Sequence, residues 1–148
     1  MDQRRKCIWA VDDNQADLDI LSIVLDDGQT VLRMFIEPRE AIDALTEATA
    51  DALPDLLILD VNMPGLSGVE FMRLVRCEPR LSNLRVYILT GAKLPTETNA
   101  MQKLGAESVL LKPLDYAGIQ ALRTKVKAAL DGTLPAAQST LAKEAQDG

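Results

Sequence analysis

The sequence predicts a three-layer α/β domain in which five parallel strands form one sheet with helices on both faces. Short apolar runs rich in β-branched residues alternate with segments of helical periodicity, the order typical of strands joined by helical crossovers. The first, third and fourth runs are almost continuously apolar, which indicates strands buried on both faces. A chain of 148 residues, 47% of them hydrophobic, has the size and apolar content of one such domain.

Five segments are predicted strands because each is short, apolar and bounded by polar or turn-forming residues. They are residues 7–11, 30–36, 55–59, 85–89 and 108–111. In the first connecting helix, Leu18, Leu21 and Leu25 recur at a spacing that places them on one face. Pro38 opens the second helix, because a first-turn position needs no backbone donor.

The third helix has the clearest start. Ser67 and Glu70 form an S-x-x-E pattern, which is typical of a capping box. The helix that follows is expected to bury Phe71, Leu74 and Val75.

The fourth helix, at about 95–104, is mostly polar and is therefore expected to be the least firmly packed. Leu94, Met101 and Leu104 are its main apolar anchors, and Gly105 is the expected stop.

The fifth helix is expected to run from a cap at Asp115 to Gly132, with four apolar residues on one side: Ile119, Leu122, Val126 and Leu130. Residues 1–132 are predicted to form one folded domain. Residues 133–148, rich in Ala, Gln, Ser and Thr, are expected to fray or to form a weak helix.

Composition excludes several classes of function. The net charge of −6 disfavours a nucleic-acid partner, which clustered Lys and Arg would have to bind. No apolar run approaches the ~20 residues of a membrane span, and the polar start is unlike a signal peptide, so we expect a cytoplasmic protein. The absence of histidine removes Ser-His and Cys-His catalysis and histidine metal sites. The two cysteines lack CxxC spacing and are expected to be ordinary thiols.

Polar residues follow four of the predicted strands: Asp12 and Asp13, Asp60, Thr90 and Lys112. Each alone could be a turn residue, a loop hydroxyl or a solvated charge. The carboxyl ends of parallel strands, however, meet at one edge of the sheet and form a crevice there. Carboxylates this close repel one another, and a hard divalent cation such as Mg²⁺ relieves the repulsion. The set therefore suits acyl-phosphate chemistry, with a carboxylate nucleophile and a lysine beside the transferred group.

From about residue 6 to residue 130 the sequence resembles the receiver domains of two-component response regulators. The resemblance rests on four motifs in order: AVDDN at 10–14, LILDVNMPGLSG at 57–68, ILTG at 88–91 and LLKP at 110–113. It implies a doubly wound, flavodoxin-like or CheY-like fold. It also implies a signalling protein rather than an enzyme with an external substrate, one that catalyses only its own phosphotransfer and slow dephosphorylation.

Carried over to this chain, the resemblance implies that Asp60 accepts phosphate from a sensor histidine kinase or a phosphotransfer protein. Asp13 and Asp60 would ligate Mg²⁺ directly, Asp12 would act through a metal-bound water, and Asn62 would offer its backbone carbonyl. The phosphoryl group would be held by Thr90 and Lys112. The family's bond between this lysine and the next proline, here Pro113, is usually cis.

The switch position departs from the family pattern. Three residues before the lysine, where the family has an aromatic residue, stands Val109. A valine has no ring to relocate, so signalling is expected through shifts of the 90–95 loop and the fourth helix. The fourth helix, the fifth strand and the fifth helix are the candidate surfaces for a second copy of the chain or for a target protein, which the sequence does not identify. A basic cluster at Arg123, Lys125 and Lys127 is expected to be a solvated face.

Two alternatives come from other classes. A receiver-like module that works without phosphorylation is favoured by Val109 and opposed by the complete set of site residues. A hydrolase of the haloacid dehalogenase type would also use an aspartate nucleophile and Mg²⁺, but it needs a second acid two residues beyond the nucleophile, where Asn62 stands. A dinucleotide-binding fold is disfavoured because no G-x-G-x-x-G follows the first strand.

Overall fold

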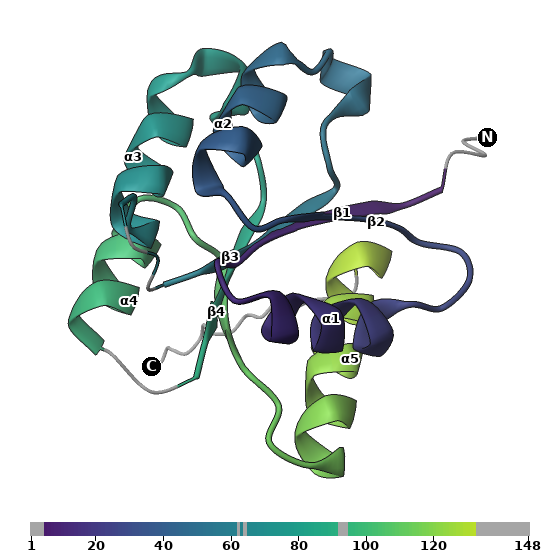
Figure 1. Ribbon diagram of the computed structural model, residues 1–148. Helices are drawn as coiled ribbons and strands as arrows, with labels where there is room; N and C mark the ends of the chain where they lie inside the picture. Colours follow the sequence, from purple (N-terminus) through teal and green to yellow (C-terminus); the bar gives the residue numbers. More distant parts are fainter. Residues whose placement is uncertain (1–4, 62, 64, 92–94, 133–148) are drawn as a thin grey trace.

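The computed structural model describes residues 5–61, 63, 65–91 and 95–132. Five strands form one parallel sheet in the order β2-β1-β3-β4-β5 (Figure 1). The strands are β1 Cys7–Val11, β2 Val31–Phe35, β3 Leu56–Asp60, β4 Val86–Thr90 and β5 Ser108–Leu111. The helices are α1 Gln15–Leu25, α2 Pro38–Glu47, α3 Gly68–Cys77, α4 Pro95–Lys103 and α5 Tyr116–Asp131, with short 3₁₀ turns at Ala50–Ala52 and Pro79–Leu81.

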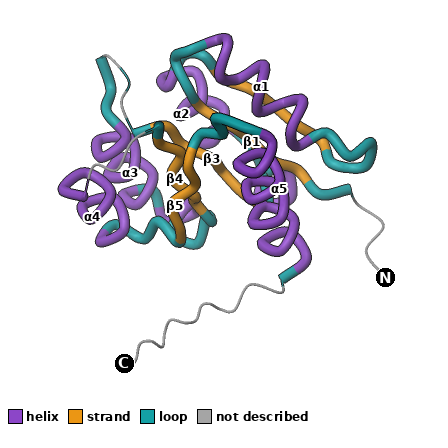
Figure 2. Tube along the Cα trace, turned by 90° about the horizontal axis from the view of Figure 1, so that it is seen from below, coloured by secondary structure: helices purple, strands orange, loops and turns teal. Residues whose placement is uncertain are grey.

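The sheet is covered on both faces, as predicted. Helices α1 and α5 lie on one face and α2, α3 and α4 on the other (Figure 2). Every residue of β3 and β4 is buried. Alternate side chains of β3 enter opposite cores, Leu57 and Leu59 the core under α2 and α3, and Leu56 and Ile58 the core under α1 and α5. The near-continuous apolar sequence of these strands is thereby explained.

All five predicted strands are present, and the third and fourth end one residue later than predicted. Asp60 pairs with Leu89 and Thr90 with Leu111, so both polar residues are the last members of their strands. The ladder extends over them because a parallel neighbour is available at that position. Both side chains are therefore placed by the sheet rather than by a loop.

Most of the predicted helix signals are confirmed. The Ser67 and Glu70 capping box is formed in full. Asp115 caps α5 by accepting from the Gly118 N–H at 2.8 Å, and Gly132 ends the helix in the left-handed region at φ 74°. The predicted anchors of α5 pack as expected against the core under α1. Leu122 and Val126 are buried there, and Ile119 and Leu130 are partly buried.

One predicted core residue is wrong. Leu74 is 46% exposed, whereas Phe71, Met72 and Val75 are buried. At about 100° per residue, the buried arc of α3 is centred between Phe71 and Met72, and Leu74 lies more than 90° from that centre. Apolar character at helical spacing did not distinguish the edge of the arc from its middle.

Helix α4 is attached mainly through Met101, which is fully buried, while Leu104 is half-buried and Gly105 ends the helix at φ 101°. The predicted anchor Leu94 and the tail 133–148 lie outside the described residues. Within the described ranges, no helix combines the length and apolar content that crossing a membrane requires.

Gly68, at the start of α3, has no side chain and so leaves room for the side chain of Met101. A Cβ atom there would lie 2.9 Å from Met101 Cε and 3.0 Å from the Asp60 carbonyl oxygen. We expect Gly68→Ala to lower the free energy of unfolding by about 2 kcal/mol, because the backbone of Asp60 cannot yield as a side chain can. Urea unfolding checks this.

Gly91→Ala is the matched control, since a Cβ atom at Gly91 would only contact Lys112 Cδ at an ordinary 3.7 Å. Its stability should stay within about 0.5 kcal/mol of the wild type. Equal stability of the two variants would show that the contact at Gly68 is not tight.

Candidate functional site

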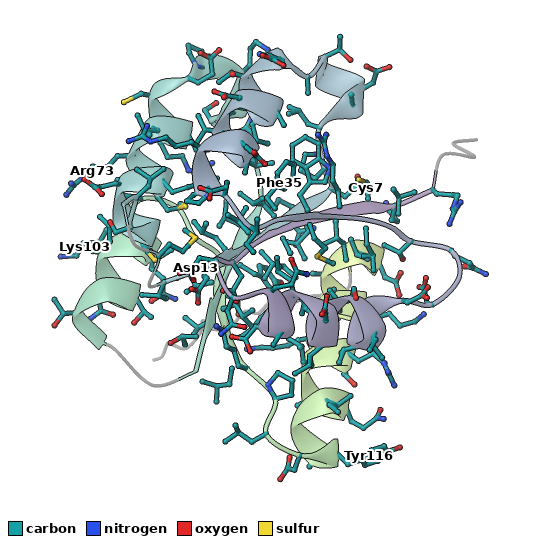
Figure 3. All side chains as sticks on the ribbon, viewed as in Figure 1. Cys7, Asp13, Phe35, Arg73, Lys103 and Tyr116 are labelled. Carbon is teal, nitrogen blue, oxygen red and sulfur yellow. The ribbon has the colours of Figure 1, made fainter. Side chains whose placement is uncertain are left out.

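Three carboxylates meet at the carboxyl edge of the sheet. Oxygen atoms of Asp12, Asp13 and Asp60 lie within 4.8 Å of one another. Asp12 and Asp60 are buried at 1% and 5% exposure, whereas Asp13, beside the start of α1, is exposed (Figure 3). Parallel neighbours β1 and β3 place these side chains together, as the sequence predicted.

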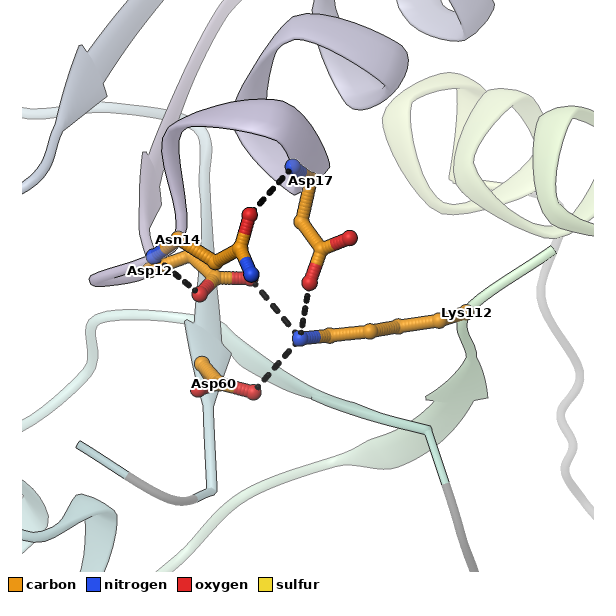
Figure 4. Close-up of polar contacts among 5 residues, drawn as sticks. All are labelled: Asp12, Asn14, Asp17, Asp60 and Lys112. Atoms are coloured by element: carbon orange, nitrogen blue, oxygen red, sulfur yellow. Dashed lines mark hydrogen bonds and ion pairs between the residues drawn. The ribbon is translucent and has the colours of Figure 1, made fainter.

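Lys112, one residue past β5, inserts its ammonium group among carboxylates (Figure 4). Its Nζ lies 3.0 Å from Asp12 Oδ2, 3.2 Å from Asp60 Oδ1 and 2.8 Å from Asp17 Oδ2. The contact with Asp17 is a hydrogen bond, and those with Asp12 and Asp60 are ion pairs. The backbone N–H of Lys112 donates to the Thr90 carbonyl at 2.8 Å, which fixes the start of the lysine side chain next to β4.

Burial raises the pKa of two carboxyl groups of the site, those of Asp12 and Asp60. Desolvation, reinforced by the charge of Asp12 and partly offset by Lys112, raises the pKa of Asp60 to about 6. Desolvation also raises the pKa of Asp12, against the opposing effects of the Asn14 N–H and of Lys112. At neutral pH the Asp60 carboxyl group is thus mostly ionised, and burying its charge lowers the stability of the fold.

Lys112 shows the opposite balance. Burial alone would lower its pKa, but the hydrogen bond to Asp17, the close contact with Asp12 and the charge of Asp60 outweigh burial, so the pKa is raised. The lysine therefore remains a fixed positive charge across the physiological pH range.

The donor set fits a divalent hard cation. Mg²⁺ prefers carboxylate oxygens as ligands, and three carboxylates are clustered here. Two of them are buried, so their negative charge is costly and a cation would offset that cost. The predicted backbone ligand Asn62 lies outside the described residues.

The remaining predicted residues have these positions. Thr90 is buried at the end of β4. Val109 is half-buried in β5 and packs against the core under α2 and α3. Its carbonyl accepts from Lys125 Nζ at 3.0 Å. The Lys112–Pro113 bond is not cis, since the described residues contain no cis peptide bond, and in the lower-energy trans form the lysine already reaches its carboxylates.

Sequence reasoning missed Asp17. The available signal was its place at the third position of α1, three residues after the cap Asn14, whose side chain accepts from the Asp17 N–H at 3.1 Å. Since α1 starts directly after β1, an acidic side chain in its first turn is carried to the same edge as Asp12. Its partner Lys112 is 95 residues away in sequence, so no local pattern reveals the pair.

The basic cluster on α5 is exposed, as predicted, but two of its side chains also donate to backbone carbonyls of other elements. Arg123 Nε donates to the Val24 carbonyl at the end of α1 at 2.9 Å, and Lys125 donates to β5. Two of its three cations thus join elements of the fold, an arrangement that the sequence reasoning did not anticipate.

Comparison with known proteins gives a consistent answer. Among curated proteins, the transcriptional regulatory protein FixJ of Bradyrhizobium diazoefficiens is 32% identical over 89% of this chain and 60% of its own length. The chain spans less than two thirds of the first curated relatives that it matches.

Solved structures share the fold. Chemotaxis protein CheY4 of Vibrio cholerae has a TM-score of 0.73 at 26% identity, covering 86% of this chain and all of that one. The Mn²⁺-bound form of response regulator Rcp1 has a TM-score of 0.73 at 22% identity, covering 85% of this chain and 95% of that one, a likeness of fold alone.

The family model described as response regulator receiver domain matches residues 8–126, well over half of the chain. The predicted family and the parallel, doubly wound fold are both confirmed. The chain therefore belongs to the response regulator receiver domains of two-component signalling systems.

Proposed function

We propose that Asp60 accepts a phosphoryl group from a sensor histidine kinase or a phosphotransfer protein, and that the phosphorylated chain signals through protein contacts. The observation that carries the proposal is the placement of Lys112 Nζ 3.2 Å from Asp60 Oδ1, beside a cluster of three carboxylates. Nucleophile, fixed positive charge and candidate cation ligands thus share one edge of the sheet.

The residues divide the chemistry among them. An oxygen of the Asp60 carboxylate attacks phosphorus as the bond from phosphorus to the donor's leaving group breaks. At pH 7 this oxygen is available because the pKa of Asp60 is about 6. Lys112 offsets the negative charge of the transferred group, and Thr90 would give it a hydroxyl donor.

The residues that would hold Mg²⁺ are Asp12, Asp13 and Asp60, with the backbone carbonyl of Asn62. Bound there, the cation would offset negative charge on the reacting oxygens. The support for a divalent ion here is the cluster of carboxylate oxygens itself, two of whose members are buried.

The output would be made by contact. Exposed apolar side chains continue from β5 into the start of α5: Leu111 at 52%, Leu114 at 93% and Tyr116 at 75% exposure. Together with α4 and the Val109 region, they offer a surface to a target protein or to a second copy of the chain. Residues 1–132 would form the receiver domain, acting in the cytoplasm and without an external substrate to turn over.

Intact mass after incubation with acetyl phosphate and Mg²⁺ tests the proposal. The wild type should gain the mass of one phosphoryl group, the gain should disappear when the cation is chelated, and Asp60→Asn should show none. Asp19→Asn is the matched control, because Asp19 lies exposed on α1 and pairs with Gln15. This control should be modified like the wild type.

Other outcomes separate the alternatives. No gain with acetyl phosphate or with a panel of phosphorylated kinases would favour a receiver-like module that works without phosphorylation. Steady turnover of small phosphomonoesters would instead indicate a hydrolase. A gain that persists in Asp60→Asn would place the acceptor on another residue.

A further inference from the structure

Three carboxylates hold the Lys112 ammonium, and they are not equivalent. Asp12 and Asp60 belong to the cluster whose oxygens lie within 4.8 Å of one another, and both are candidate cation ligands. Asp17 is outside that cluster, on α1, yet it makes the shortest of the three contacts at 2.8 Å.

This difference matters when a divalent cation binds. The cation would take up the charge of Asp12 and Asp60, the two acceptors that it would share with Lys112. It would also repel the ammonium, since like charges a few ångströms apart in a partly buried site interact strongly. Of the three acceptors, Asp17 is the one that keeps its full charge for the lysine.

Asp17 is placed to keep that contact. Its backbone N–H is bound by the side chain of Asn14, which fixes the first turn of α1. Its side chain is 31% exposed, in contrast to 2% for Asp12, so the charge of Asp17 is well solvated without the cation. A bound cation would relieve the cost of burying the Asp12 charge. The Asp17 charge is in contact with water and needs no such compensation.

We propose that Asp17 is a positioning residue that keeps the Lys112 ammonium beside Asp60 once the cation is bound. The inference rests on the proposed function, because the purpose of the contact is to have the lysine ready for the incoming phosphoryl group. Asp17 itself need not touch that group: it acts through Lys112.

The first test observes the ammonium directly. In ¹H–¹⁵N spectra, the Nζ signal of Lys112 is identified by its loss in Lys112→Arg. With saturating Mg²⁺, its protons should exchange with water about tenfold faster in Asp17→Asn than in the wild type, the scale expected for loss of one hydrogen bond between charged groups. Without Mg²⁺ the difference should be much smaller, because Asp12 and Asp60 still hold the ammonium.

Two further variants separate positioning from a general effect of charge. Asp19→Asn, which changes the net charge equally on the same helix, should behave as the wild type. Asp17→Glu should restore slow exchange in part. With acetyl phosphate and saturating Mg²⁺, phosphorylation should be about tenfold slower in Asp17→Asn and should recover in Asp17→Glu.

Equal protection of the ammonium in Mg²⁺-loaded wild type and Asp17→Asn would overturn the inference. Phosphorylation of Asp17→Asn at the wild-type rate or faster would also overturn it, because Asp17 would then compete with the phosphoryl group for the lysine. The exchange measurement needs no phosphorylation. A wild type that protects the ammonium through Asp17 but takes up no phosphate would therefore refute the proposed function and leave the positioning intact.

Discussion

Asp60→Asn is expected to raise the free energy of unfolding of the metal-free protein at pH 7 by about 2 kcal/mol. The pKa of Asp60 rises from its ordinary value of 3.8 to about 6, chiefly because burial penalises the carboxylate. That rise corresponds to about 3 kcal/mol of cost for the ionised form. A neutral amide imitates a neutral carboxyl only approximately, so the variant should recover most of this cost rather than all.

The stabilisation should depend on pH in a defined direction. Because the pKa of Asp60 is higher in the folded state than in the unfolded state, the folded protein binds the proton more tightly between about pH 4 and pH 6. The carboxyl group therefore costs nothing below about pH 4, and its cost grows as the pH rises to about 6. Asp60→Asn should differ little from the wild type at pH 4 and reach its full advantage at pH 7.

Urea unfolding at the two pH values measures this, with Asp19→Asn as the control that should stay within about 0.5 kcal/mol of the wild type. Adding Mg²⁺ should stabilise the wild type more than Asp60→Asn, since a ligand that binds only the folded state adds to its stability. A variant less stable than the wild type at pH 7 would mean that the ion pair with Lys112 outweighs the cost of burial.

The sequence predicted where the residues of the candidate site lie, because each of the main ones directly ends or follows an apolar strand. Asp12, Asp60 and Lys112 could be brought together from strand order alone, since parallel strands share one carboxyl edge. The chemistry proposed for these residues stays a prediction, which rests on a carboxylate nucleophile, candidate cation ligands and a lysine lying in one crevice. Val109 lies in β5 as predicted, but its role in signalling stays a prediction.

The features that sequence reasoning missed depend on contacts between distant elements. Leu74 has an apolar side chain at an acceptable helical spacing, and only the direction from which the sheet approaches α3 leaves it exposed. Asp17 resembles any acidic residue in a first helical turn. Its contact with Lys112 depends on β5, which brings the lysine from the other end of the chain, and no local spacing records that arrangement.

Arg76 also makes contacts between distant elements. Arg76→Met is expected to lower the free energy of unfolding by about 3 kcal/mol. Its guanidinium donates to the carbonyls of Leu104 and Gly105, after α4, at 2.8 and 3.1 Å, and to those of Leu81 and Ser82 at 3.0 and 3.2 Å. With a net value of about 0.5–1.5 kcal/mol for each hydrogen bond, four lost donations give this magnitude.

Because α4 is attached mainly through Met101, loss of Arg76 should also loosen that helix before the rest of the fold. Amide exchange should accelerate most at the turn after α4, where the guanidinium lies so close to Gly105 that a Cβ atom there would be 3.0 Å from Arg76 Nε. Arg76→Lys should have a stability between those of the wild type and Arg76→Met, since a point charge cannot bind two pairs of carbonyls as a planar guanidinium does.

Arg73→Met is the matched control, because it removes the same charge from an exposed position of α3. It should lower the free energy of unfolding by less than about 0.5 kcal/mol. Uniform acceleration of exchange across all helices would show that Arg76 stabilises the fold as a whole, and equal losses from Arg73→Met and Arg76→Met would reduce its role to charge.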